Sequence, residues 1–114
     1  MGNKKSAHQK ALELLGRKPE IIGIPRRYIL ASSIEQVIYP RGRPSQLDLV
    51  FLVKFPNEGL KAIIIEYKSN GRPVNERRGK IQLETAVNFY NKKLGIPAEG
   101  RFIPGTTYPL LKRT

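Results

Sequence analysis

The residues from 60 to 68, LKAIIIEYK, constrain the fold most, because an apolar run ends there in a glutamate and a lysine. The run predicts a β-strand that is apolar on both faces, and such a strand lies in the middle of a covered sheet. QLDLVFLVKF, at 46–55, has the same character, and PNEG, at 56–59, is a turn signal between the two. The sequence therefore predicts a hairpin at the centre of a sheet.

Four further segments have the periodicity of helices or strands: predicted helices at 4–16 and 76–95, and predicted strands at 34–39 and 101–111. The apolar residues that repeat at helical spacing are Ala7, Ala11, Leu14 and Leu15, then Leu83, Val87, Tyr90 and Leu94. The order helix, strand, strand, strand, helix, strand predicts an α/β fold, with a mixed central sheet flanked by helices.

The length of 114 residues predicts one domain over 1–114, and the net charge of +12 (21 − 9) favours a polyanionic partner, most simply nucleic acid. A basic ribosomal protein or a merely cationic surface is the alternative. The absence of cysteine excludes disulfides and thiolate zinc sites, and a single histidine, His8, disfavours a histidine-based metal site. Any metal is expected to be a hard cation held by oxygens.

No apolar run approaches the roughly 20 residues that a membrane span needs, and no secretory apolar segment follows the N-terminus. The sequence therefore predicts no membrane partner and an intracellular, cytoplasmic location, associated with the nucleoid.

Asp48 and Glu66 stand inside the two central apolar runs, where a carboxylate needs a partner. Alternation puts Glu66 and Lys68 on one face, and a hairpin centred near residue 57 or 58 puts Asp48 opposite positions 66 to 68. Mg²⁺ can bridge two such carboxylates, lower the pKa of a water and offset charge on a phosphate. Lys68 would then orient the attacking water or stabilise negative charge, and the Tyr67 carbonyl could add a ligand. A structural ion pair of Lys68 with either carboxylate is the alternative.

This pattern resembles the PD-(D/E)XK nuclease superfamily, in which an Asp in one strand precedes Glu-x-Lys in the next. Here it reads Asp48, then Ile65-Glu66-Tyr67-Lys68-Ser69. The resemblance implies a restriction-endonuclease-like core (α-β-β-β-α-β), with Mg²⁺ or Mn²⁺ on Asp48 and Glu66 and with Lys68 as the catalytic lysine. Some branches of the superfamily place a glutamine on the following helix, and Gln82 fits that position.

Within the superfamily, the stretch from Gln46 to Pro97 is most similar to the archaeal Holliday junction resolvases, with a serine at Ser45 or Ser33 and the exit Gly95-Ile96-Pro97. Leu47 replaces the family proline. Lys10 stands where the resolvases have a first-helix glutamate, with His8 and Glu13 nearby, and Glu13 is expected to be a solvated helix residue. The small phage nucleases of the VRR-Nuc branch are a second resemblance, through Gly42-Arg43-Pro44 and Gln82.

The sequence thus predicts a metal-dependent DNA endonuclease that hydrolyses phosphodiesters, is selective for branched or otherwise structured DNA and acts as a homodimer. The alternative is a non-catalytic, basic nucleic-acid-binding module on the same fold. The residues expected to contact nucleic acid flank the proposed site in the sequence: Arg41, Arg43, Ser45, Arg72, Arg77, Arg78 and Lys80.

Overall fold

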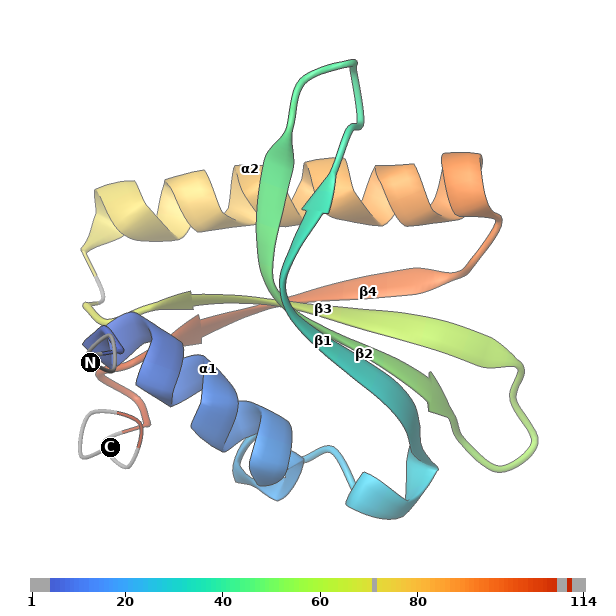
Figure 1. Ribbon diagram of the computed structural model, residues 1–114, viewed down its shortest axis with the longest axis horizontal. Coiled ribbons are helices and arrows are strands. Elements are labelled where there is room, and N and C mark those ends of the chain that lie inside the picture. The colour runs from blue at the N-terminus through green and yellow to red at the C-terminus, as the bar shows by residue number, and fades with distance from the viewer. Residues whose placement is uncertain (1–4, 71, 109–110, 112–114) are drawn as a thin grey trace.

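The computed structural model describes residues 5–70, 72–108 and 111, which form a four-stranded mixed sheet between two helices (Figure 1). The strands follow the order β1 to β4 across the sheet: β1 (Ile29–Ile38), β2 (Ser45–Lys54), β3 (Leu60–Lys68) and β4 (Ala98–Pro104). The first three strands are antiparallel neighbours, and β4 runs parallel to β3. The predicted α/β class and element order are confirmed.

The two helices cover opposite faces of the sheet, so the central strands are buried on both sides. Helix α1 (Ala7–Arg17) packs on the face that carries Leu49, Phe51 and Ile65. Helix α2 (Pro73–Phe89) packs on the face that carries Val50 and Ile64. This two-sided burial is what the apolar runs in β2 and β3 predict. None of the helices within the described ranges is long and apolar enough to cross a membrane.

A tight turn joins β2 to β3 and sets their register. The N–H of Glu58 donates to the carbonyl of Phe55, and Asn57 has φ 64°, a conformation that Asn tolerates better than most residues. Pro56 precedes it, as is common in a type II turn. The ladder then pairs Leu49 with Ile65. One step further along, Asp48 stands opposite Glu66, within the predicted range.

Strand β1 differs from its prediction. It begins at Ile29 and ends at Ile38, whereas the sequence pattern predicts 34–39. The reason is that Ile29 and residues 31 to 33 also pair with β2, with a register shift between Ile29 and Ala31, although this segment alternates poorly. β1 is an edge strand, and several of its apolar side chains are exposed, among them Leu30 (64%) and Val37 (49%).

Helix α1 begins later than predicted, at a well-formed cap. The hydroxyl of Ser6 accepts the N–H of Gln9, and the Gln9 side chain accepts the N–H of Ser6, which is a capping box. The predicted start, Lys4, lies outside the described residues. The buried stripe consists of Ala11, Leu12 and Leu15, whereas Ala7 of the predicted stripe is exposed.

The second half of the chain contains three boundary corrections. Helix α2 begins at Pro73 rather than at residue 76, because proline suits the first helical turn. It ends at Phe89, and a π-helical turn, Tyr90–Leu94, follows it. That turn leaves Leu94 48% exposed, so the predicted stripe is wrong there. The last strand is Ala98–Pro104 rather than 101–111, because pairing with β3 selects those residues; positions 109 and 110 of the predicted range lie outside the described residues.

Candidate active site

Asp48 and Glu66 lie at the ends of the two central strands, and both are buried. The exposed fractions of the two residues are 9% and 4%. They stand opposite each other one step past the last pair of the β2–β3 ladder. Two carboxylates in such a place repel each other and lose hydration, so each needs a compensating partner.

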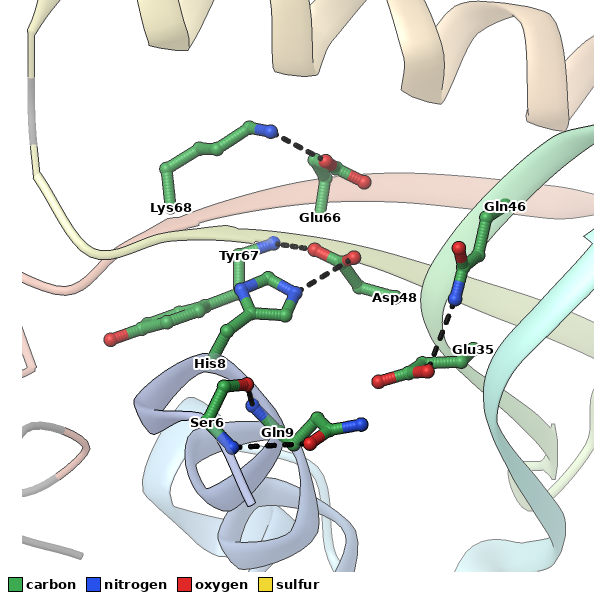
Figure 2. A network of polar contacts seen from close by, with 9 residues as sticks. All are labelled: Ser6, His8, Gln9, Glu35, Gln46, Asp48, Glu66, Tyr67 and Lys68. Atoms are coloured by element: carbon green, nitrogen blue, oxygen red, sulfur yellow. Dashed lines mark hydrogen bonds and ion pairs between the residues drawn. The ribbon is translucent and has the colours of Figure 1, made fainter. Parts of the chain in front are cut away.

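The carboxylate of Asp48 is held from two directions (Figure 2). Its Oδ2 accepts the backbone N–H of Tyr67 at 2.8 Å, and its Oδ1 lies 3.1 Å from Nε2 of His8 on α1. The bond to Asp48 raises the pKa of His8 above its usual 6.5, although burial opposes the shift. Asp48 therefore links the end of β3 to the first turn of α1.

Glu66 is held by Lys68, two residues further along the same face of β3. Nζ of Lys68 lies 3.3 Å from Oε2 of Glu66, which confirms that the two side chains project together. Burial, and after it the charge of Asp48, raises the pKa of Glu66 from 4.5 to about 7, while Lys68 opposes the shift. The site thus holds a carboxyl group whose ionised form is disfavoured when only the protein surrounds it.

Gly79 allows α2 to approach Glu66 closely. A Cβ at this position would lie 2.7 Å from the ring of Phe102 and 3.3 Å from Cγ of Glu66. Glycine inside a helix costs about 0.5–1 kcal/mol relative to alanine. Gly79 is buried where the helix meets the end of the sheet, and the contacts there leave no room for a side chain.

These side chains line an open cleft of about 580 Å³, referred to below as the cleft. The predicted residues Asp48, Glu66, Lys68 and Gln82 all line it. The other lining residues come from α1 and its cap and from β1 and β2: Ser6, His8, Gln9, Glu35 and Gln46. The cleft therefore collects residues from five elements of the fold and from the cap of α1.

The predicted nucleic-acid contacts fall into two groups. Arg41, Arg43 and Ser45 line a hollow at the tip of the β1–β2 hairpin. The others occupy the start of α2 and do not line the cleft: Arg72, Arg77, Arg78 and Lys80. Lys80 pairs with Glu76 at 3.3 Å, one helical turn earlier.

Four further residues belong to the elements that surround the cleft: Tyr67, Glu13, Ser33 and Ser45. The Tyr67 side chain packs into the core under α1, with its ring centroid 5.7 Å from that of His8. Glu13 pairs with Lys5 at 2.7 Å and lies outside the cleft, so it is a surface helix residue as expected. Neither candidate serine lines the cleft: Ser33 and Ser45 line two other hollows, although Ser45 precedes Gln46 of the cleft in β2.

The sequence reasoning missed His8 and Glu35. His8 precedes Ala11 by three residues and Leu12 by four, so helical spacing could have placed it on the buried face of α1. Glu35 had no comparable signal. It has φ 55°, rare for a residue within a strand, and it stands opposite Asp48 between the pairs Ile34–Leu49 and Gln36–Leu47. Gln46 Nε2 donates to its carboxylate at 3.2 Å.

The donor set in the cleft fits a hard divalent cation. Asp48 and Glu66 supply carboxylate oxygens, and a cation would relieve the cost of ionising Glu66. Within residues 5–70, 72–108 and 111, no three His, Cys, Asp or Glu side chains are grouped so that they could hold a metal ion together. The arrangement fits a cation that binds two carboxylates and completes its coordination with water and phosphate, as Mg²⁺ usually does.

Comparison with known proteins gives no relative. No protein-family model matches the chain, and neither a curated protein nor a solved structure matches it.

Proposed function

We propose that this protein is a divalent-metal-dependent DNA endonuclease with a restriction-endonuclease-like core, which hydrolyses phosphodiester bonds in the cleft. The observation that carries the proposal is the buried pair Asp48 and Glu66, with Nζ of Lys68 3.3 Å from Glu66. A fold gains no stability from two opposed, buried carboxylates beyond the last pair of its central ladder. Such an arrangement is understandable if the carboxylates bind a ligand.

Asp48, Glu66 and the backbone carbonyl of Tyr67 would hold Mg²⁺ or Mn²⁺. The cation, when bound, supplies positive charge that acidifies water and offsets charge on the phosphate. His8 and the Tyr67 N–H each hold one oxygen of the Asp48 carboxylate, so the group needs little reorganisation.

Lys68 is the proposed catalytic lysine. Hydrolysis adds water across one P–O bond, and negative charge accumulates on the phosphate oxygens as the bond to the leaving oxygen breaks. The Lys68 side chain is 31% exposed, so its ammonium can turn from Glu66 toward a phosphate. Gln82, on the α2 side of the cleft, offers an amide that can orient the phosphate or the water.

The basic residues supply the affinity for DNA. Arg41, Arg43 and Ser45 line the hollow at the tip of the β1–β2 hairpin, and Arg72, Arg77 and Arg78 are exposed at the start of α2. Contacts of this kind bind phosphates and position the DNA without reading its sequence. Lys80 would have to exchange its pairing with Glu76 for a phosphate.

The alternative function is a non-catalytic nucleic-acid-binding module. One observation favours it: no buried side-chain nitrogen or oxygen in the described part of the chain lacks a hydrogen-bond partner. The pairs of His8 with Asp48 and of Lys68 with Glu66 could therefore be structural. This module would bind DNA without metal and without cleavage.

We also propose a homodimer, acting on branched DNA in the cytoplasm at the nucleoid. The edge strand β1 supports the dimer, since an edge strand can pair with a second copy, and Leu30 and Val37 of β1 and Tyr39 just after it are exposed. Light scattering coupled to size exclusion should give twice the 12.9 kDa chain mass, and Val37→Lys should restore the monomer.

The function is tested by cleavage of labelled four-way junction, nicked, single-stranded and linear duplex DNA with Mg²⁺, Mn²⁺ or EDTA. We expect metal-dependent cutting by the wild type and a loss of about 100-fold or more in Glu66→Gln and Lys68→Met. Glu58→Gln, which removes an exposed carboxylate in the β2–β3 turn and outside the cleft, is the matched control. If the wild type binds these DNAs tightly and cuts none of them, the endonuclease function is excluded and the function of a nucleic-acid-binding module remains.

A further inference from the structure

A second concave surface lies between the tip of the β1–β2 hairpin and the outer side of α2, referred to below as the groove. Figure 1 shows the hairpin crossing α2 and extending beyond it. The groove has a volume of about 450 Å³. Pro40 and Arg41 line it from the hairpin, residues of α2 from Ile81 to Phe89 form its side, and Lys92 and Lys93 lie at its far end.

The groove combines cations with an apolar surface. Arg41, Lys92 and Lys93 outnumber the one carboxylate there, that of Glu84. Within the described residues, these three cations form no ion pair. The side chain of Ile81 is 60% exposed beside them.

Phe89 adds an aromatic ring to the same lining and is partly exposed. A duplex presents phosphates but keeps its bases stacked inside, whereas an unpaired strand presents both phosphates and base faces. Proteins that bind single strands pair a cationic track with aromatic or apolar surface for this reason. The lining of the groove therefore suits an unpaired strand better than a duplex.

The groove and the cleft share no lining residue, but neighbouring residues of α2 line the two. Gln82 lines the cleft, and its neighbour Ile81 lines the groove. On the hairpin side, Arg41 belongs both to the groove and to the hollow that Ser45 lines, and Ser45 adjoins Gln46 of the cleft. A strand that leaves the cleft can thus follow the hairpin and α2 into the groove without crossing a carboxylate-rich surface.

We propose that the groove binds an unpaired DNA strand that continues from the position held in the cleft. Arg41, Lys92 and Lys93 contact its phosphates, and bases lie against Ile81 and Phe89. This inference rests on the proposed function and narrows the substrate to DNA in which a single-stranded arm adjoins the cleaved bond.

The test measures binding rather than cleavage. Fluorescence anisotropy in EDTA compares a blunt duplex with the same duplex carrying an unpaired tail of about ten nucleotides on either strand. We expect the wild type to bind one tailed DNA about tenfold more tightly than the blunt duplex, and K92A/K93A to bind both within about twofold. The matched control is K18A/K54A, which removes two exposed lysines outside the groove and should keep the tenfold preference.

Ile81→Ala separates the apolar contribution from charge. It removes an exposed side chain without altering the core, and it should reduce the preference for the tail about threefold without changing duplex affinity. Equal binding of tailed and blunt DNA by the wild type would overturn the proposal. An equal loss of affinity for both DNAs in K92A/K93A would also overturn it. So would an oligo-aspartate peptide that displaces the tailed DNA as effectively as the free single strand does.

Failure here and failure of the proposed function are distinguishable. If the protein prefers tailed DNA but cuts none of the DNAs, the proposal for the groove stands and the nuclease function is excluded. If cleavage depends on Glu66 and Lys68 but the protein shows no preference for tailed DNA, the nuclease function stands and the proposal for the groove is excluded.

Discussion

The β2–β3 hairpin has two buried regions that are chemically opposite: an apolar end on the side of the turn and a polar end away from it. At the apolar end, Phe51, Val53 and Ile63 are completely buried. At the far end of the same strands, Asp48 and Glu66 are buried to nearly the same degree. Burial stabilises the first end, at roughly 25 cal/mol per Å² of apolar surface, and costs free energy at the second, because charged groups lose hydration.

The comparison teaches that the polar end needs partners from other elements. His8 of α1, the Tyr67 N–H and Lys68 compensate the two carboxylates, and even so the pKa of Glu66 stays raised to about 7. The apolar end needs only close packing of its side chains. Substitutions at the two ends should therefore have different sizes and different dependence on pH and on metal.

The largest change in stability is expected at the apolar end. Phe51→Ala removes a completely buried ring and should lower the free energy of unfolding by about 3–5 kcal/mol. Urea denaturation monitored by circular dichroism measures the loss, which should be the same at pH 5.5 and pH 8. A loss below about 1 kcal/mol would contradict the tight packing of this end.

Glu66→Gln should act in the opposite direction when metal is absent. Between 4.5 and about 7 the native state binds more protons at Glu66 than the unfolded state, so raising the pH through this window lowers the stability of the wild type. The loss is up to about 3 kcal/mol, and Glu66→Gln should remove most of it. Melting curves in EDTA from pH 5 to pH 8 test this.

Glu84→Gln is the control for that series and should leave the pH dependence unchanged. A smaller residual slope of the same sign should persist in Glu66→Gln, because the pKa of His8 is also raised in the native state. Adding Mn²⁺ at pH 8 should raise the melting temperature of the wild type and not that of Glu66→Gln. An identical metal response in both proteins would contradict a cation on Glu66.

Gly79→Ala tests the close approach of α2 to the polar end. The added methyl group would meet the Phe102 ring at 2.7 Å, and the strain should outweigh the better helix propensity of alanine, with a net loss of about 1–2 kcal/mol. Gly16→Ala on α1 is the matched control, since its nearest contact is 3.8 Å away, and it should be neutral or stabilising. Chemical denaturation of both variants measures the two changes in stability. Equal changes would contradict the close contact between Gly79 and Phe102.

Ser6→Ala should have the smallest effect. It removes the side-chain cap of α1 and should lower stability by about 1 kcal/mol. Because His8 lies in the first turn of that helix, its ring should also be held less firmly against Asp48. The His8 ring proton resonances report this in NMR spectra, with Ser32→Ala, an exposed strand serine, as the control. Unchanged His8 resonances would show that the cap does not position the ring.

The local pattern of the sequence determined the central hairpin and half of the candidate site. The apolar run predicts β3 at Leu60–Lys68, and the turn at Asn57 fixes a register that opposes Asp48 and Glu66. Strand alternation then places Lys68 beside Glu66. These features depend on residues near one another in the chain, so periodicity and turn chemistry are sufficient to predict them.

Only the tertiary structure decided the rest. His8 reaches Asp48 across 40 positions in the sequence, and Glu35 enters the cleft because of a positive φ that no residue pattern announces. The limits of β1 and β4 depend on which residues their neighbouring strands pair with, and Gly79 is explained by Phe102 on another element. Contacts between distant segments depend on how the layers pack, and the physical reason is that packing is a property of the whole fold, whereas hydrophobic periodicity belongs to each segment separately.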